Sequence, residues 1–117
     1  MATGVAFGAF GAHALKDAVS PGDLQIWEKA VLYQLVHGVS ALVLTSSEQI
    51  IPRASNRSRA AALMLTSVCI FSGTLYLLVL TGHRWLGMIT PIGGMGFILS
   101  WLYVAFQVLR PPLEPRN

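Results

Sequence analysis

The sequence is poor in charged residues and has a single cysteine, and both shortages limit what the protein can be. Only 11% of its 117 residues are charged and 54% are hydrophobic, whereas soluble domains carry roughly 25% charged residues. A soluble protein of this size could not bury so much apolar surface, and its exposed patches would aggregate. Cys69 lies in an apolar run, so a disulfide within the chain and a cysteine metal cluster are excluded, and we expect a buried, inert thiol. The composition therefore predicts a single domain embedded in a membrane.

Several functional signatures are also missing. The net charge is only +3, and the basic residues lie in loops and at the C-terminus, so the dense basic face of a nucleic-acid-binding protein is not present. The sequence contains no phosphate-binding glycine loop, no HExxH motif and no serine elbow. We therefore predict no enzymatic activity, no cofactor, no metal site and no nucleic-acid partner.

Four apolar segments, at residues 1–15, 26–45, 60–80 and 86–109, predict an all-α transmembrane bundle of four helices in one domain, residues 1–117. Ser20 and Pro21 predict the start of the second helix, because serine caps helices and proline suits the first helical position. Gly82 is suited to ending the third helix. Pro91 marks either a kink or the true start of the fourth, and a kink there could free carbonyls toward a ligand or ion path.

The first segment is short for a membrane span. Fifteen residues give a helix of about 22 Å, against roughly 30 Å of hydrocarbon. Either the bilayer thins locally, or the start has been placed late and part of this helix is missing. A signal peptide is a competing interpretation, because Ala12-His13-Ala14 resembles a cleavage site, but no basic residue precedes the apolar run.

The segment from Trp27 to Ser40 carries a polar stripe, and we expect the other helices to pack around it. Lys29, Tyr33 and His37 follow one another at four-residue steps, so they share one helix face, and Gln34 lies beside them. Such a stripe must face protein or water rather than lipid. Together Lys29, Tyr33, Gln34 and His37 form a candidate intramembrane polar site.

His37 is the most suggestive residue of this site. It follows Trp27, a predicted interfacial anchor like Trp85, by ten residues, which places it about 15 Å deep. Its imidazole could be a neutral group bonded to a neighbouring helix, a proton-handling or ligand-binding group, or a metal or haem ligand.

A second polar group is expected at the outer ends of the first two helices. His13 and Lys16 lie one turn apart, and Glu28 precedes Lys29 at the start of the second helix. Because a short link joins the two helices, we expect His13, Lys16 and Glu28 to form one polar cluster. It would either fix the helical hairpin through ion pairs or handle protons.

Small residues recur at helical spacing and predict close helix packing. In the third segment Gly73 shares a face with Thr66, Cys69, Ser72 and Tyr76. In the fourth, Gly93 and Gly96 begin a heptad-like series that continues through Ser100, Tyr103 and Gln107. The glycines predicted to lie at helix contacts are Gly4, Gly8, Gly11, Gly73, Gly93 and Gly96.

Basic residues predict the orientation in the membrane. With four spans, one side holds five basic residues and the other three: Arg53, Arg57, Arg59, Arg110 and Arg116 against Lys16, Lys29 and Arg84. The positive-inside rule then places both termini in the cytoplasm.

Four separated motifs carry a family resemblance. They are GAFGAHALK (8–16), WEKAVLYQLVH (27–37), FSGTLYLL (71–78) and TPIGG (90–94). In this order and spacing the chain resembles the domain of unknown function 423 family, small multi-pass inner-membrane proteins of bacteria. The resemblance implies the same location, but the family has no assigned activity and no established catalytic or binding residues that could be transferred to this chain. The chain departs from the family at its N-terminus, where a longer first helix is usual.

Three functions stay open from the sequence. The first is a structural or accessory protein that packs against other membrane proteins or against itself. The second is a proton-coupled small-solute transporter or channel, formed as an oligomer and using His37, Tyr33, Lys29 and Glu28. The third is a lipid- or quinone-binding module with Tyr33 and His37 as polar contacts.

Overall fold

The computed structural model describes residues 1–110, which form helices and contain no strand. Helix α1 (Ala2–Phe10) continues as the π-helical segment η1 (Gly11–Leu15). The long helices are α2 (Pro21–Ser46) and α3 (Ala54–Thr81). A 3-10 segment, η2 (Arg84–Met88), precedes α4 (Thr90–Leu109). The all-α prediction is confirmed.

Local chemistry explains three of the helix ends: the start of α2, the end of α3 and the start of α4. The Ser20 hydroxyl accepts the Asp23 backbone N–H, which caps α2, and Pro21 is its first residue. Gly82 ends α3 with a positive φ of 71°, a conformation that glycine adopts without strain. Pro91 lies in the first turn of α4, so it marks a helix start and not a kink.

The third helix begins earlier than predicted, at Ala54 instead of residue 60. The reason is Arg57, whose guanidinium is buried and donates to the carbonyls of Ile51 and Pro52 and to Glu48. These bonds satisfy the arginine and the loop carbonyls together, so a basic residue is accommodated inside the first turn of the helix.

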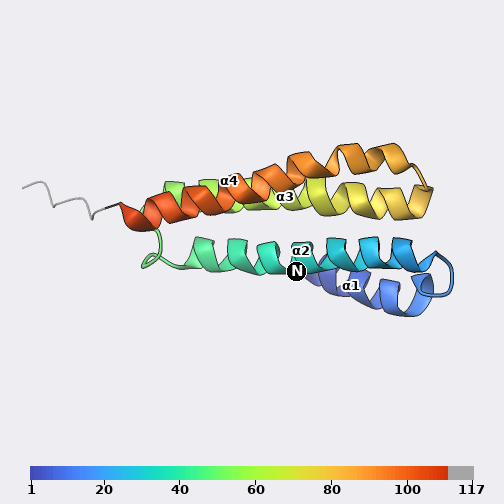
Figure 1. Cartoon of the computed structure of the whole chain (residues 1–117). Helices are drawn as coiled ribbons and strands as arrows, with labels where there is room; N and C mark the ends of the chain where they lie inside the picture. Colours follow the sequence, from blue (N-terminus) through green and yellow to red (C-terminus); the bar gives the residue numbers. More distant parts are fainter. Residues whose placement is uncertain (111–117) are drawn as a thin grey trace, which may run out of the picture.

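Helix α3 runs antiparallel to α2 and α4 and is their common neighbour, so α2 and α4 run in the same direction (Figure 1). Helix α3 packs against both α2 and α4, whereas α2 and α4 do not pack backbone to backbone within residues 1–110. Helix α4 still packs against residues 27–40, as predicted, but through side chains: Phe97 and Trp101 contact His37. Helix α1 lies along one half of α2, with the Met1 side chain against Gly38.

Trp27 and Cys69 lie in surroundings opposite to those predicted. Trp27 is only 1% exposed and contacts the rings of Phe7, Phe10 and Tyr76, so it is a core residue and not an interfacial anchor. Its indole N–H donates to the Phe7 carbonyl at 2.8 Å. Cys69 is exposed, because Ser72 and Tyr76 occupy the inward face of α3 instead.

Two segments of the described chain are long and apolar enough to cross a membrane: Ala54–Thr81 and Arg84–Leu109. Helix α2 is also long, but its polar side chains lower its mean hydropathy, and it is not one of the two. Ala2–Leu15 is apolar and shorter. Of the basic residues used for the predicted orientation, Arg116 lies outside the described residues.

Candidate functional site: an aromatic groove between α2 and α4

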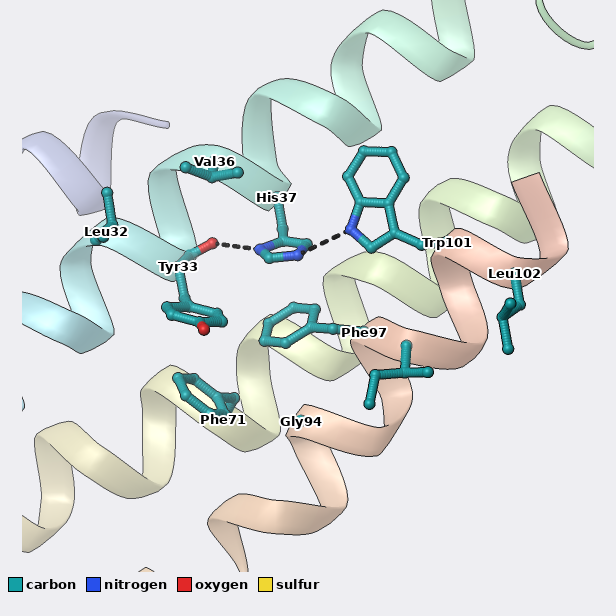
Figure 2. A pocket seen from close by; sticks show the side chains of 10 residues that line it. Leu32, Tyr33, Val36, His37, Phe71, Gly94, Phe97, Trp101 and Leu102 are labelled. Carbon is teal, nitrogen blue, oxygen red and sulfur yellow. Dashed lines mark hydrogen bonds between the residues drawn. The ribbon is translucent and has the colours of Figure 1, made fainter. Parts of the chain in front are cut away.

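A groove of about 860 Å³ opens between α2 and α4, where the two helices face each other without backbone contact (Figure 2). Most of its walls come from these two helices, and Phe71 of α3 joins them. We call it the aromatic groove, and it is lined by Leu32, Tyr33, Val36, His37, Phe71, Gly94, Phe97, Ile98, Trp101 and Leu102. Its lining contains no Lys, Arg, Asp or Glu.

His37 joins the two helices across this groove. The residue is buried, with 7% of its surface exposed. The Nδ1 atom lies 2.9 Å from the Tyr33 carbonyl, and the Trp101 indole N–H lies 3.2 Å from Nε2. A carbonyl only accepts and an indole N–H only donates, so Nδ1 carries the proton and Nε2 accepts. The site therefore holds a neutral imidazole, because a protonated Nε2 would face the indole N–H donor.

The aromatic rings of the groove stack in a continuous series. The His37 and Phe97 ring centroids are 3.8 Å apart, and Tyr33 stacks on Phe71 at 4.6 Å. Tyr33 also lies 5.6 Å from His37 with nearly parallel planes. The His37–Phe97 contact packs α2 against α4, and the Tyr33–Phe71 contact packs α2 against α3. The groove therefore has an aromatic wall with defined ring orientations.

Tyr33 and His37 differ in whether their polar side-chain atoms are already hydrogen-bonded. Tyr33 is 37% exposed and lies near the midpoint of α2. The Tyr33 backbone carbonyl accepts a hydrogen bond from His37, but within residues 1–110 the Tyr33 hydroxyl has no hydrogen-bond partner. The phenol is therefore a donor that is still available in the groove.

The other two residues of the predicted intramembrane site lie elsewhere. Lys29 is exposed and does not line the groove. Gln34 points to the other side of α2, where it donates to the Thr3 hydroxyl at 2.9 Å and accepts from Tyr76 at 2.7 Å. Gln34 thus links α1, α2 and α3. The predicted four-residue site is divided: Tyr33 and His37 meet, and Lys29 and Gln34 do not join them.

The predicted outer cluster does not form. His13, Lys16 and Glu28 are each exposed, and within residues 1–110 no hydrogen bond or ion pair joins them. The π-helical turn η1 and the Trp27 contacts set the angle between the first two helices instead.

An ion pair at the same end of the molecule was missed by the sequence analysis. Arg84 of η2 contacts Asp23 of α2, with one guanidinium nitrogen 3.0 Å from Oδ2. The Arg84 hydrogen bond, with that of Ser20, holds the pKa of the Asp23 carboxyl below its usual range. The only signal in the sequence was the topology, which brings the turns near residues 20 and 83 to one end (Figure 1).

The predicted packing glycines differ in what surrounds them. A Cβ on Gly4 or Gly11 would collide with Leu35 or with the Trp27 ring, and one on Gly8 would touch Val31. A Cβ on Gly93 would stand 2.5 Å from the Phe71 backbone nitrogen, and one on Gly96 would collide with Ser67. A Cβ on Gly73 would meet no atom within 4 Å of the described structure, so the helix contact predicted there is not present.

Comparison with known proteins agrees with this membrane-type architecture. The sequence profile of the DUF423 family, described as a protein of unknown function, matches residues 7–94. The chain belongs to the DUF423 family. It is 46% identical over 108 residues to a UPF0382 membrane protein of Staphylococcus epidermidis, covering 91% of this chain and 85% of that relative. It is 34% identical over 106 residues to the UPF0382 membrane protein YwdK of Bacillus subtilis, covering 91% and 86%. No solved structure matches the chain.

These findings establish a DUF423 membrane protein with an all-α fold. The family carries no assigned activity, so any function must be argued from the groove and its surroundings.

Proposed function

We propose that this DUF423 protein binds a neutral apolar ligand, drawn from the bilayer, in the aromatic groove. The observation that carries the proposal is a groove of about 860 Å³ with aromatic walls and no charged lining residue, open at the side of the molecule. Ligand pockets in proteins span about 300–1,000 Å³ and are mostly apolar with a few polar groups. Leu32 and Leu102 at the groove are more than half exposed, so a bilayer ligand would enter from the side.

The accessory function has one supporting observation. The outer face of α4 exposes a continuous row of large apolar side chains, which a second membrane protein or a second copy could cover: Ile92, Met95, Leu99, Leu102 and Phe106. However, the close contacts at Gly4, Gly11, Gly93 and Gly96 lie inside the chain and do not serve a partner. A surface that lipid alone can cover gives weaker support than a shaped groove.

The transport function has less support from the geometry. A proton relay needs a group that can accept and release protons along a path, and both His37 nitrogens are engaged in hydrogen bonds. Lys29 and Glu28, the other groups assigned to this path, are exposed away from the groove.

The location and orientation belong to the same proposal. We place the chain in the bacterial inner membrane as a multi-pass, non-enzymatic protein, with lipid as its first partner. The end of α4 would lie in the cytoplasm, because Arg53, Arg57, Arg59 and Arg110 gather at the end where α3 starts and α4 finishes. The N-terminus, predicted on the same side, does not reach this end, because Met1 packs against Gly38 part-way along α2.

The test is a groove-filling substitution, Gly94→Leu, with Gly73→Leu as its matched control. A Cβ on Gly94 meets only the Phe71 ring, at 3.9 Å, so leucine can enter the groove without a backbone clash. A Cβ on Gly73 meets nothing within 4 Å. Each protein would be purified in a mild detergent from bacterial membranes, and its bound small molecules and native mass would be measured by native mass spectrometry.

We expect an apolar molecule to co-purify with the unmodified protein and with Gly73→Leu, and to be lost from Gly94→Leu. No bound molecule in the unmodified protein, or equal occupancy in all three, would overturn the proposal. A larger particle that contains other proteins and survives Gly94→Leu would favour the accessory function instead.

A further inference from the structure

The polar groups of the aromatic groove specify what kind of ligand it can hold, provided that the proposed function is right. Only Tyr33, His37 and Trp101 among its lining residues carry polar side-chain atoms. His37 and Trp101 use theirs on each other and on the Tyr33 carbonyl. Within the described residues this leaves the Tyr33 hydroxyl as the one side-chain donor that a ligand can reach.

The position of Tyr33 makes an unpaired hydroxyl costly. Tyr33 lies near the midpoint of α2, twelve residues after Pro21, or about 18 Å along the helix. In the bilayer placement proposed above, this depth lies in hydrocarbon without water to bond the hydroxyl, and an unpaired polar group in an apolar medium is unfavourable. A ligand that offers an acceptor to the hydroxyl therefore gains a hydrogen bond with little competition.

The groove also constrains the charge and shape of the ligand. Its lining residues carry no formal charge, because His37 is held in its neutral form. A charged headgroup would find no compensating partner there. Tyr33 and Trp101 are partly exposed and present aromatic ring surface to the groove, whereas His37 and Phe97 are buried against each other. Exposed ring surface suits a planar ring better than a flexible chain.

We infer that the aromatic groove binds a neutral, planar, carbonyl-bearing lipid of the quinone class, whose carbonyl oxygen accepts the Tyr33 hydroxyl. The ring lies against the aromatic wall, and the apolar tail leaves past Leu32 and Leu102 toward the bilayer. Tyr33 is then the residue that distinguishes this ligand from a plain hydrocarbon.

The experiment compares two probes that share a tail and a ring size. Decylubiquinone has ring carbonyls and decylbenzene has none. Their occupancy would be measured by native mass spectrometry in nanodiscs of one lipid composition, for the unmodified protein, Tyr33→Phe, Tyr103→Phe and Gly94→Leu. Tyr103 lies on α4 outside the groove, so Tyr103→Phe controls for losing a phenol hydroxyl as such.

We expect Tyr33→Phe to weaken decylubiquinone binding about two- to tenfold, the loss of one hydrogen bond. Decylbenzene binding should not change in Tyr33→Phe, and Tyr103→Phe should resemble the unmodified protein with both probes. If both probes bind and both are lost in Gly94→Leu, but Tyr33→Phe has no effect, the groove binds apolar molecules and the quinone class is overturned. If neither probe depends on Gly94, the proposed function itself fails.

Discussion

Gly93 and Gly73 differ in whether their surroundings leave room for a side chain. Gly93 is buried where α4 meets α3, and no room is left beside the Phe71 backbone. Gly73 lies on α3 beside open space. The two residues look equivalent in the sequence, because each occurs in an apolar helix among small neighbours.

The expected result is that Gly93→Ala destabilises the fold by about 1–3 kcal/mol, the usual cost of overpacking a filled contact. Gly73→Ala should cause no loss, because its methyl group meets nothing and alanine is the better helix former. Both free energies of unfolding can be measured by denaturant titration in detergent micelles. Equal stabilities for the two variants would contradict the contact seen at Gly93.

The start of α2 and the segment η2 form a unit at one end of the molecule. The Asp23 carboxylate accepts from the Ser20 hydroxyl and pairs with Arg84, so it joins the cap of α2 to the turn before α4. The Arg84 side chain is 63% exposed and the Asp23 side chain 15%, so solvent reaches the pair mainly from the arginine and screens it. Its contribution should therefore be visible chiefly through its dependence on pH.

The pKa of Asp23 is lowered in the folded protein, first by its Arg84 bond and then by its Ser20 bond. A lowered folded-state pKa stabilises the fold above the ordinary Asp value, about 3.9, and this contribution disappears as the pH falls through the folded-state value. Thermal melts from neutral to acidic pH should show a larger acid loss of Tm in the unmodified protein than in Asp23→Asn. Asp17→Asn, at an exposed position in the same turn region, serves as the control and should follow the unmodified protein.

At the scale of the whole molecule, the helix directions are fixed relative to one another, so the membrane orientation of one segment determines that of the others. Figure 1 shows the turns near residues 16–20 and 82–83 at one end, with the loop at residues 47–53 and the end of α4 at the other. A measurement of the side of the membrane on which one of these ends lies therefore assigns the sides of both ends of all three long helices. Reporter fusions after Arg110 and within residues 47–53 should be active in the cytoplasm, and a fusion within residues 16–20 should be active outside. The opposite pattern would mean that the basic end faces outward and would reject the proposed orientation.

The sequence predicted the helical architecture through local rules. Ser20 with Pro21 and Gly82 each act within one helical turn, so the start of α2 and the end of α3 could be predicted without knowing any neighbour. The predicted start of α3 was wrong, because Arg57 is accommodated by two carbonyls and by Glu48 of the preceding loop. A guanidinium looks unfavourable in a helix start until its acceptors are known.

The candidate site was predictable only in part. Helical spacing placed Tyr33 and His37 on one face of α2, and they do meet in the groove. Nothing in the spacing of α2 could identify Trp101, 64 residues away from His37, as the indole that binds its Nε2. Nor could it show that Gln34, next to Tyr33, would turn to Thr3 and Tyr76.

The sequence by itself determined that this chain is an apolar all-α membrane protein with small residues at helical spacing, because composition and periodicity are properties of each segment alone. The tertiary structure decided which faces are covered. It buried Trp27, exposed Cys69 and left α2 and α4 apart with aromatic rings between them. The physical reason is that distances between helices depend on side chains from several segments at once, such as Gly93 against Phe71 and His37 against Phe97. The aromatic groove arises from this packing of several helices and is not a property of any single segment.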